Sequence, residues 1–290
     1  MGLDAWLHRL RYALAGSPAA TRLALAVRNQ CALVVGLAVT RRCGHTNLTR
    51  NGEGLLASAA APRVRTFIDV GANVGEWTAH LLGAAGRPLQ GVLVEPGAEA
   101  AARLRARFAD QPGLTVVEAA ASDEAHPAVT FHEEPGAGET SSLVAGASRA
   151  DSLARQVEAV TLDALVAAQG WPAVDLLKID TEGHDLRVLQ GARQLLAEGR
   201  LGLIQLEYNA AWRACDSSVL EARHLLGRHG YALWLLTPAG LTPLELDRLG
   251  DFFSYANLVA VSPTWQAQVG ASLPLVPMPG RVATGLTSGA

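Results

Sequence analysis

Two stretches of the chain place charged side chains where apolar runs end. In the first, "RTFIDVGANVGEWTAHLL", an apolar run ends at Asp69, and Gly71 and Gly75 follow. This order predicts a strand, a tight turn and a helix, an arrangement that is typical of nucleotide-like cofactor sites. The spacing is G-x-x-x-G rather than G-x-G-x-x-G, and the carboxylate would repel a pyrophosphate. We therefore expect a cofactor with an ammonium group and no phosphate, and S-adenosylmethionine has this chemistry.

The next predicted strand and the stretch after it add candidates for the same site. Glu95 ends that strand, where a carboxylate can accept hydrogen bonds from both ribose hydroxyls, although NAD enzymes use such an acid too and a solvated acid is the alternative. In "AAASDE", Ala121 leaves room for adenine, and Asp123 either meets its amino group or forms a turn with Ser122. The expected cofactor-binding residues are Asp69, Gly71, Asn73, Gly75, Glu76, Trp77, Glu95, Ala121, Asp123 and Asp180.

The second charged stretch is "VDLLKIDTEGHD". Lys178 and Asp180 share one face of a predicted strand, and "IQLEYN" brings Glu207 to the corresponding place on the next strand. Lys178 neutralises Asp180 or Glu207, or it belongs to a purely structural ion-pair network. His184 is either a general base or a polar loop residue. The expected catalytic residues are Asp180, His184 and Glu207.

The same acids raise the question of a metal. Asp180, Glu182 and Glu207 are carboxylates, which suit Mg²⁺. The sequence does not show that their oxygens converge. We therefore keep a divalent cation as an alternative and expect no metal.

The elements that position these residues alternate from Arg65 onward. Predicted strands and helices follow one another, and several strands are almost continuously apolar, as in a sheet covered by helices on both faces. This predicts an α/β fold with a doubly wound, mostly parallel sheet. We expect a helical extension at residues 1–60, the α/β domain at 61–262 and a flexible tail at 263–290.

The composition narrows the classes of molecule that the chain is expected to bind. The chain has 290 residues, a net charge of −3 and a pI near 6.2, which gives no basic face for nucleic acid. Cys31, Cys43 and Cys215 are widely spaced and read as reduced, mostly buried thiols of a cytoplasmic protein. The best apolar run, residues 31–39, is about half the ~20 residues that a membrane span needs. We expect it to form a packed helix, or alternatively a basic segment resting on a membrane surface.

Several motifs together resemble the FkbM-type methyltransferase family. The matching stretches are "FIDVGANVGEWT", "VEP", "AAASDE", "ETSSL", "VTLDAL", "LLKIDTEGHDLRVLQGA" and "IQLEYN", over about Phe67 to Asn209. The family commonly has alanine and glutamate where this chain has His184 and Asp185. The resemblance implies a class I methyltransferase-like fold and S-adenosylmethionine-dependent O-methylation, often of a sugar or polyketide hydroxyl.

Two other functions remain as alternatives. One is an NAD-dependent dehydrogenase or epimerase, and the other is a non-catalytic module that kept a cofactor pocket. The acceptor is expected to be a small molecule or a glycan, bound by "EPGAGETSSLV", the N-terminal extension and "YNAAWRACDSS". Tyr208 and Trp212 either stack on a sugar face or only pack the loop.

Overall fold

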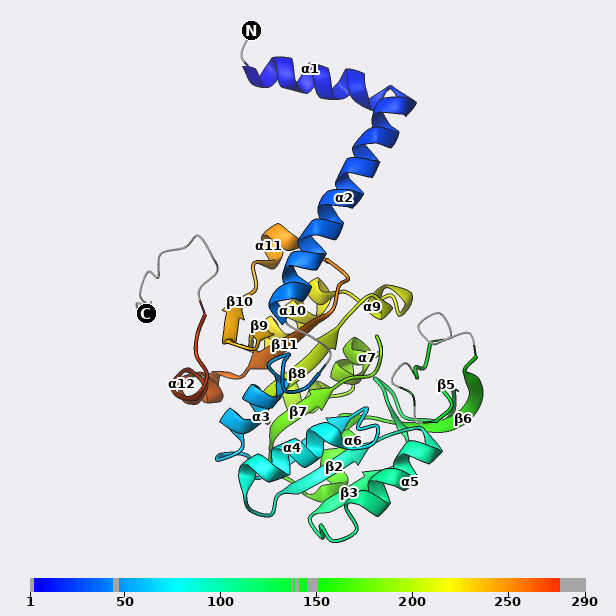
Figure 1. Cartoon of the computed structure of the whole chain (residues 1–290), viewed down its shortest axis with the longest axis vertical. Helices are drawn as coiled ribbons and strands as arrows, with labels where there is room; N and C mark the ends of the chain where they lie inside the picture. Colours follow the sequence, from blue (N-terminus) through cyan, green and yellow to red (C-terminus); the bar gives the residue numbers. More distant parts are fainter. Residues whose placement is uncertain (1–2, 44–46, 137, 139–140, 145–150, 277–290) are drawn as a thin grey trace.

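The centre of the molecule is a twisted sheet covered by helices on both faces (Figure 1). The computed structural model describes residues 3–43, 47–136, 138, 141–144 and 151–276. Within this part, eight strands form the main sheet in the order β10-β9-β11-β8-β7-β1-β2-β3. The strands are β1 (Thr66–Val70), β2 (Gln90–Val94), β3 (Leu114–Val117), β7 (Val174–Ile179), β8 (Leu201–Tyr208), β9 (Ala232–Thr237), β10 (Gly240–Pro243) and β11 (Ala256–Val261).

The parallel part of the sheet contains the switch point that the fold class requires. The strands β3, β2, β1, β7 and β8 run parallel, whereas β11 is antiparallel to both β8 and β9. The chain passes from β1 outward to β2 and β3, and later returns to β7 on the other side of β1. Ligands of such sheets bind at the carboxyl ends of the strands beside this reversal. The predicted doubly wound, mostly parallel sheet is thus confirmed.

Side chains alternate along β1 and divide the core into two layers. Phe67 packs with α3 (Glu53–Ala60), α4 (Glu76–Ala85) and α5 (Ala98–Arg107) on one face. Ile68 packs with the layer on the other face. That second layer contains α6 (Leu162–Gln169), α7 (Asp185–Gln190), α8 (Arg193–Ala197) and α10 (Val219–Arg228), and the short helices α9 (Ala211–Ala214) and α11 (Leu246–Leu249) lie near it.

A second sheet lies beside the carboxyl ends of the main sheet. It has the order β4-β6-β5, with β4 at Ala120–Ala121, β5 at His126–Glu133 and β6 at Leu153–Val160. The strands β5 and β6 pair in the antiparallel sense. The sequence predicts one doubly wound sheet and does not separate β5 and β6 from it.

The N-terminal extension forms two helices that project from the domain. Figure 1 shows α2 (Pro18–Cys43) leaving the domain and α1 (Leu3–Ala15) turning away from its axis. Only Gly36, Val39 and Cys43 of α2 are buried. The expectation of a packed helix therefore holds only for its last turns, and Cys31 is exposed rather than buried.

The length of α2 changes the argument about membranes. The helix has 26 residues, because it continues through the polar residues Arg28, Asn29 and Gln30 that precede the apolar run. Among the described residues, it is the one helix long and apolar enough, by length and composition, to cross a bilayer. The nine-residue apolar run is therefore only part of a longer helix.

The chain end also differs from expectation. Pro263–Ser272 forms α12, and Val269 and Leu273 are buried against the α3 face of the sheet. Apolar residues in "TWQAQVGASL" therefore hold this segment in the domain. Residues 277–290 of the predicted flexible tail lie outside the described part.

Candidate active site

A cavity of about 940 Å³ opens at the carboxyl ends of the parallel strands. Its wall includes the turn after β1, the ends of β2, β7 and β8, and part of β5. Residues 47–49 at the end of the N-terminal extension and residues 138 and 141–143 also line it. The two charged stretches that the sequence singles out therefore face one space.

The first glycine turn is wedged between two neighbouring strand ends. Gly71 has a φ of +75°, and a Cβ at this position would lie 1.8 Å from the carbonyl oxygen of Asp180. Its amide donates a hydrogen bond of 2.9 Å to the carbonyl oxygen of Val94 at the end of β2. The turn therefore needs glycine because backbone from two strands surrounds it. Four of the predicted cofactor residues of this turn line the cavity: Gly71, Asn73, Glu76 and Trp77.

Gly75 and Asp69 occupy different places from those expected. Gly75 does not line the cavity; a Cβ there would lie 2.5 Å from Cε2 of Phe108, so this glycine allows close packing of α5. Asp69 is fully buried beneath the cavity and does not line it either. Its Oδ2 accepts a 2.6 Å hydrogen bond from Thr78, and its Oδ1 has no hydrogen-bond partner. This geometry therefore does not favour a direct contact between Asp69 and a cofactor ammonium.

Glu95 lines the cavity and is tied to the backbone. It accepts hydrogen bonds from the amides of Asn73 (2.9 Å) and Gly97 (2.8 Å). Burial raises the pKa of Glu95 to about 7, against the lowering effect of these two amides. The carboxyl group is thus held between β2 and the glycine turn.

Of the pair predicted near adenine, one residue reaches the cavity. Ala121 lines it. Asp123 does not: it accepts a hydrogen bond from Ser122 (2.9 Å) and forms an ion pair with Arg187 (3.2 Å). The turn alternative describes Asp123 better than the adenine contact.

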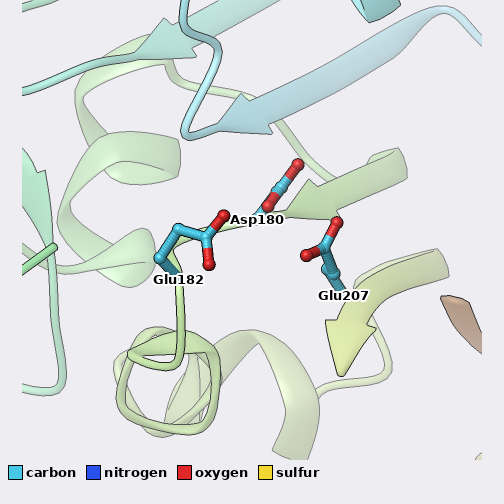
Figure 2. Close-up of side chains that lie close together, drawn as sticks. All are labelled: Asp180, Glu182 and Glu207. Atoms are coloured by element: carbon cyan, nitrogen blue, oxygen red, sulfur yellow. The ribbon is translucent and has the colours of Figure 1, made fainter. Parts of the chain in front are cut away.

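Three carboxylates meet at the ends of β7 and β8. Asp180 follows β7, Glu182 lies in the next turn, and Glu207 is on β8 (Figure 2). Each offers an oxygen within 4.8 Å of the others. The amide of Asn209 donates to Glu182 (3.1 Å) and to Glu207 (2.9 Å), which holds both in place. The convergence that the sequence left open is present.

Lys178, a buried residue of β7, supplies positive charge to this cluster. Its ammonium lies 2.8 Å from Oδ2 of Asp180 and 3.9 Å from Oδ1 of Asp69. These acids raise the pKa of Lys178 although burial acts in the opposite direction, so it stays charged. Of the two partners considered for Lys178, the structure pairs it with Asp180. Burial, and then the charges of Asp180 and Glu182, raise the pKa of Glu207 well above its usual range.

His184 lines the cavity but is poorly suited to take a proton. Its Nε2 lies 3.0 Å from the hydroxyl of Ser122. Burial lowers the pKa of His184 to about 4, which makes it a weak base at neutral pH. Asp185, next to it, is fully buried and accepts hydrogen bonds from Thr181 and Gly183 rather than lining the cavity.

The comparisons with known proteins bear directly on these residues. The model of the methyltransferase FkbM domain matches residues 69–233, which is more than half of the chain. The chain belongs to this family. The matched part begins at Asp69 and contains the glycine turn, the second charged stretch and the whole carboxylate cluster.

Similar solved structures include other methyltransferases. The methyltransferase FkbM from Methylobacillus flagellatus KT is 19% identical, with a TM-score of 0.44 over 68% of this chain and 43% of that one. The chain thus matches less than half of that protein's length. The O-methyltransferase TomG from Streptomyces achromogenes, solved with SAM, is 12% identical, with a TM-score of 0.41 over 73% of this chain and 80% of that one. No curated protein matches the chain.

The FkbM-family site also contains residues that the sequence analysis missed. Glu53 of α3 lines the cavity, and its carboxylate accepts hydrogen bonds from Asn51 (2.6 Å) and Gln205. Burial raises the pKa of Glu53. Glu53 lies outside the matched family region. No local pattern in "NGEGLL" indicates a site residue, because Glu53 comes close to β8 only in the folded chain.

The expected acceptor segments contribute unequally. Ser141, Ser142 and Leu143 of "ETSSL" line the cavity, whereas Glu139 and Thr140 lie outside the described residues. Tyr208 and Trp212 are fully buried, with their ring centroids 5.1 Å apart. They pack the loop, so the sugar-stacking alternative is not supported.

Proposed function

We propose that this FkbM-family chain transfers a methyl group from S-adenosylmethionine to a hydroxyl oxygen of a sugar, a glycan or a hydroxylated small molecule. The observation that carries the proposal is that the carboxylates of Asp180, Glu182 and Glu207 face the same cavity as Gly71 and Glu95. Groups suited to an amino-acid-bearing nucleoside and groups suited to an acceptor hydroxyl thus share one space. A volume of about 940 Å³ is at the upper end of small-ligand pockets and suits two ligands together.

The proposed reaction is an in-line displacement. The acceptor oxygen forms a bond to the methyl carbon while the bond from that carbon to the sulfonium sulfur breaks, and the hydroxyl proton passes to a carboxylate. Alcohols are poor nucleophiles at neutral pH, so a nearby base is needed. The ammonium of Lys178 donates a hydrogen bond to Oδ2 of Asp180 and fixes the side chain of Asp180. Oδ1 of Asp180 is then left to accept the proton of the acceptor hydroxyl. The chain's main task is to align the reacting atoms.

A metal-assisted variant uses the same residues. The converging oxygens of the three carboxylates match the ligand type that Mg²⁺ prefers. In that variant Asp180, Glu182 and Glu207 would hold the cation, which would supply a positive charge that lowers the pKa of the acceptor hydroxyl. Chelation separates the two routes: with a base alone, EDTA leaves turnover unchanged, whereas with a cation EDTA abolishes it and added Mg²⁺ or Mn²⁺ restores it.

Two measurements test the proposal. Titration calorimetry is expected to show binding of S-adenosylmethionine or its demethylated product, and no binding of NAD. A screen with methyl-labelled cofactor across glycans and hydroxylated small molecules is then expected to give a labelled ether product. Tight NAD binding would favour the dehydrogenase or epimerase alternative. Cofactor binding without transfer to any hydroxyl, amine or carboxylate acceptor would favour the non-catalytic module.

A further inference from the structure

The exposed apolar side chains of this protein are concentrated on α1 and α2. Of the thirteen large hydrophobic residues exposed among those described, eleven lie on these two helices. They are Trp6, Leu10, Tyr12, Leu14, Leu23, Leu25, Val27, Leu33, Val34, Val35 and Leu37. Scattered exposed apolar residues are normal on a soluble domain, but a concentration on one element marks an interaction surface. We call residues 3–43 the arm.

The apolar residues of α2 surround the helix rather than forming one stripe. Leu33, Val34 and Val35 follow one another, about 100° apart around the axis, and are exposed by 57%, 66% and 37%. Leu25, exposed by 44%, lies in the direction that these three leave open. A helix that is apolar all round needs an apolar environment all round, as in a membrane. A single partner helix or a second copy of the chain would cover only one side.

The length of α2 fits a bilayer. Its first buried residue is Gly36, and residues 18–35 before it would be about 27 Å long, close to the ~30 Å thickness of a hydrocarbon core. Arg22 and Arg28 interrupt this stretch. The guanidinium of Arg28 donates hydrogen bonds of 3.3 and 3.0 Å to the side chain of Asn29, and the long stems of both arginines let their charges reach toward the headgroups.

The charge of the arm points to the kind of lipid. The arm has six arginines and one acidic residue, Asp4, although the whole chain has a net charge of −3. In α1, Leu7, Leu10 and Leu14 fall on one helical face, and Arg9 and Arg11 lie on its two sides. Such a helix suits the boundary between headgroups and acyl chains, where Trp6 is also favoured. Anionic headgroups attract the arginines.

We propose that the arm anchors this chain in a lipid bilayer with anionic headgroups, with α2 inserted among the acyl chains and α1 at headgroup level. The catalytic domain stays in water, joined to the bilayer through the end of α2. There, Val39 and Cys43 pack into the domain core and Thr40 donates a hydrogen bond of 3.1 Å to the carbonyl of Tyr255. The proposal does not depend on the reaction that the domain catalyses.

The test is flotation of the full chain with vesicles. Phosphatidylcholine vesicles with and without phosphatidylglycerol are mixed with the protein, floated, and washed with high salt and with alkaline carbonate. The wild type is expected to float with vesicles, more with phosphatidylglycerol, and to resist both washes. The variant Leu33→Asp places a charge in the inserted stretch, and we expect its vesicle-bound fraction to fall by at least about tenfold.

Leu153→Asp is the matched control, because Leu153 and Leu33 are both 57% exposed and only Leu33 lies on the arm. We expect it to float like the wild type, and thermal melting of both variants checks that the domain remains folded. The proposal is overturned if Leu33→Asp floats as well as the control, or if salt alone strips the wild type. It is also overturned if the wild type stays in solution as a dimer that Leu33→Asp dissociates.

Discussion

Asp180 is held differently from the other two carboxylates of the cluster. An ammonium 2.8 Å away fixes one of its oxygens, whereas Asn209 holds Glu182 and Glu207. Burial keeps the pKa of Glu207 high, so Glu207 tends to carry its proton. Asp180 is also more accessible than its lysine partner, with 28% of its side chain exposed against 7%. These differences make Asp180 the stronger candidate for contact with the acceptor.

Asp180→Asn is therefore expected to lower turnover by roughly 10²–10⁴, the usual contribution of acid–base catalysis, with a much smaller loss of cofactor affinity. Steady-state methyl transfer and calorimetry measure the two effects. Asp123→Asn is the control, since Asp123 is paired outside the cavity and its change should leave turnover near that of the wild type. If Asp180→Asn is fully active, the site is misassigned and Glu207 becomes the next candidate.

Glu95 predicts a pH-dependent cofactor affinity. Its pKa is raised to about 7, and only the ionised carboxylate can accept hydrogen bonds from both ribose hydroxyls. Affinity for S-adenosylmethionine should therefore rise as pH increases toward 7, by up to about tenfold per unit, and level off above it. Calorimetry from pH 5.5 to 8.5 measures this slope. Glu95→Gln should bind more weakly, by roughly 1–3 kcal/mol at pH 8, and without the slope; equal slopes would show that Glu95 does not hold the ligand.

The sequence predicts the positions of acids at strand ends well, and their partners poorly. Strand periodicity places Lys178 and Asp180 on one face, and the register then pairs Lys178 with Gln205 on β8. The burial of Asp69 is decided by Thr78 and by the neighbouring strand, which no single stretch encodes. Glu53 is the clearest case, because its contacts with the site span more than a hundred residues of chain.

The turn between β1 and α4 allows a test of the contact between this turn and the end of β7. Gly71→Ala would place a methyl group 1.8 Å from the carbonyl oxygen of Asp180, so the turn or the end of β7 must move. We expect at least about a tenfold loss of cofactor affinity and of turnover, beyond the usual cost of a left-handed alanine. Gly86→Ala has a similar positive φ (+60°) but open space around it, and it should lose only about 1 kcal/mol of stability. Calorimetry and thermal melts compare the two, and equal cofactor affinity in both would refute the contact.

The first residue of α7, Asp185, is a fully buried acid whose charge opposes folding. Burial raises the pKa of Asp185 well above its usual value, and its Oδ1 has no hydrogen-bond partner. The protonated form is favoured in the folded state, so its contribution to stability is present below pH about 4 and is lost as pH rises through the folded pKa. Asn cannot ionise. The stability of Asp185→Asn relative to the wild type should therefore increase with pH.

Urea unfolding at pH 5 and pH 8 measures this difference. Asp247→Asn serves as the control, because the side chain of Asp247 is 86% exposed and its ion pair with Arg223 lies on the surface. We expect no change with pH in its stability relative to the wild type. The same result for Asp185→Asn would show that Asp185 is ionised in the folded protein without cost.

Elements were predictable where the apolar pattern matches the burial: continuous in a strand covered on both faces, and helically spaced in a helix covered on one. The parallel strands and their helices follow this rule. The length of α2 did not, because its polar residues Arg28, Asn29 and Gln30 resemble a boundary although helix propensity carries through them. The separation of β5 and β6 into a second sheet depends on their pairing with β4, which the alternation within each strand does not specify.

At the scale of the whole molecule, stability is unevenly distributed. The strands β1 and β7 are covered on both faces, whereas residues 18–35 of α2 contact little of the domain. Without lipid, amides of this part of the arm should exchange with solvent much faster than those of β1 and β7. Hydrogen exchange followed by mass spectrometry measures both. Exchange of the arm as slow as that of β1 would mean that it is packed against another chain.

The carboxylate-rich floor of the cavity has a consequence for turnover. In the proposed reaction the cofactor enters with a positive sulfur and leaves as a neutral thioether, while the carboxylates of Asp180 and Glu182 stay in the same cavity. Attraction between a cation and carboxylates is strong in a partly desolvated pocket and disappears when the cation is neutralised. Methyl transfer thus removes the charge that retained the ligand. The reaction is therefore expected to weaken binding of the demethylated product, so that another molecule of S-adenosylmethionine can replace it.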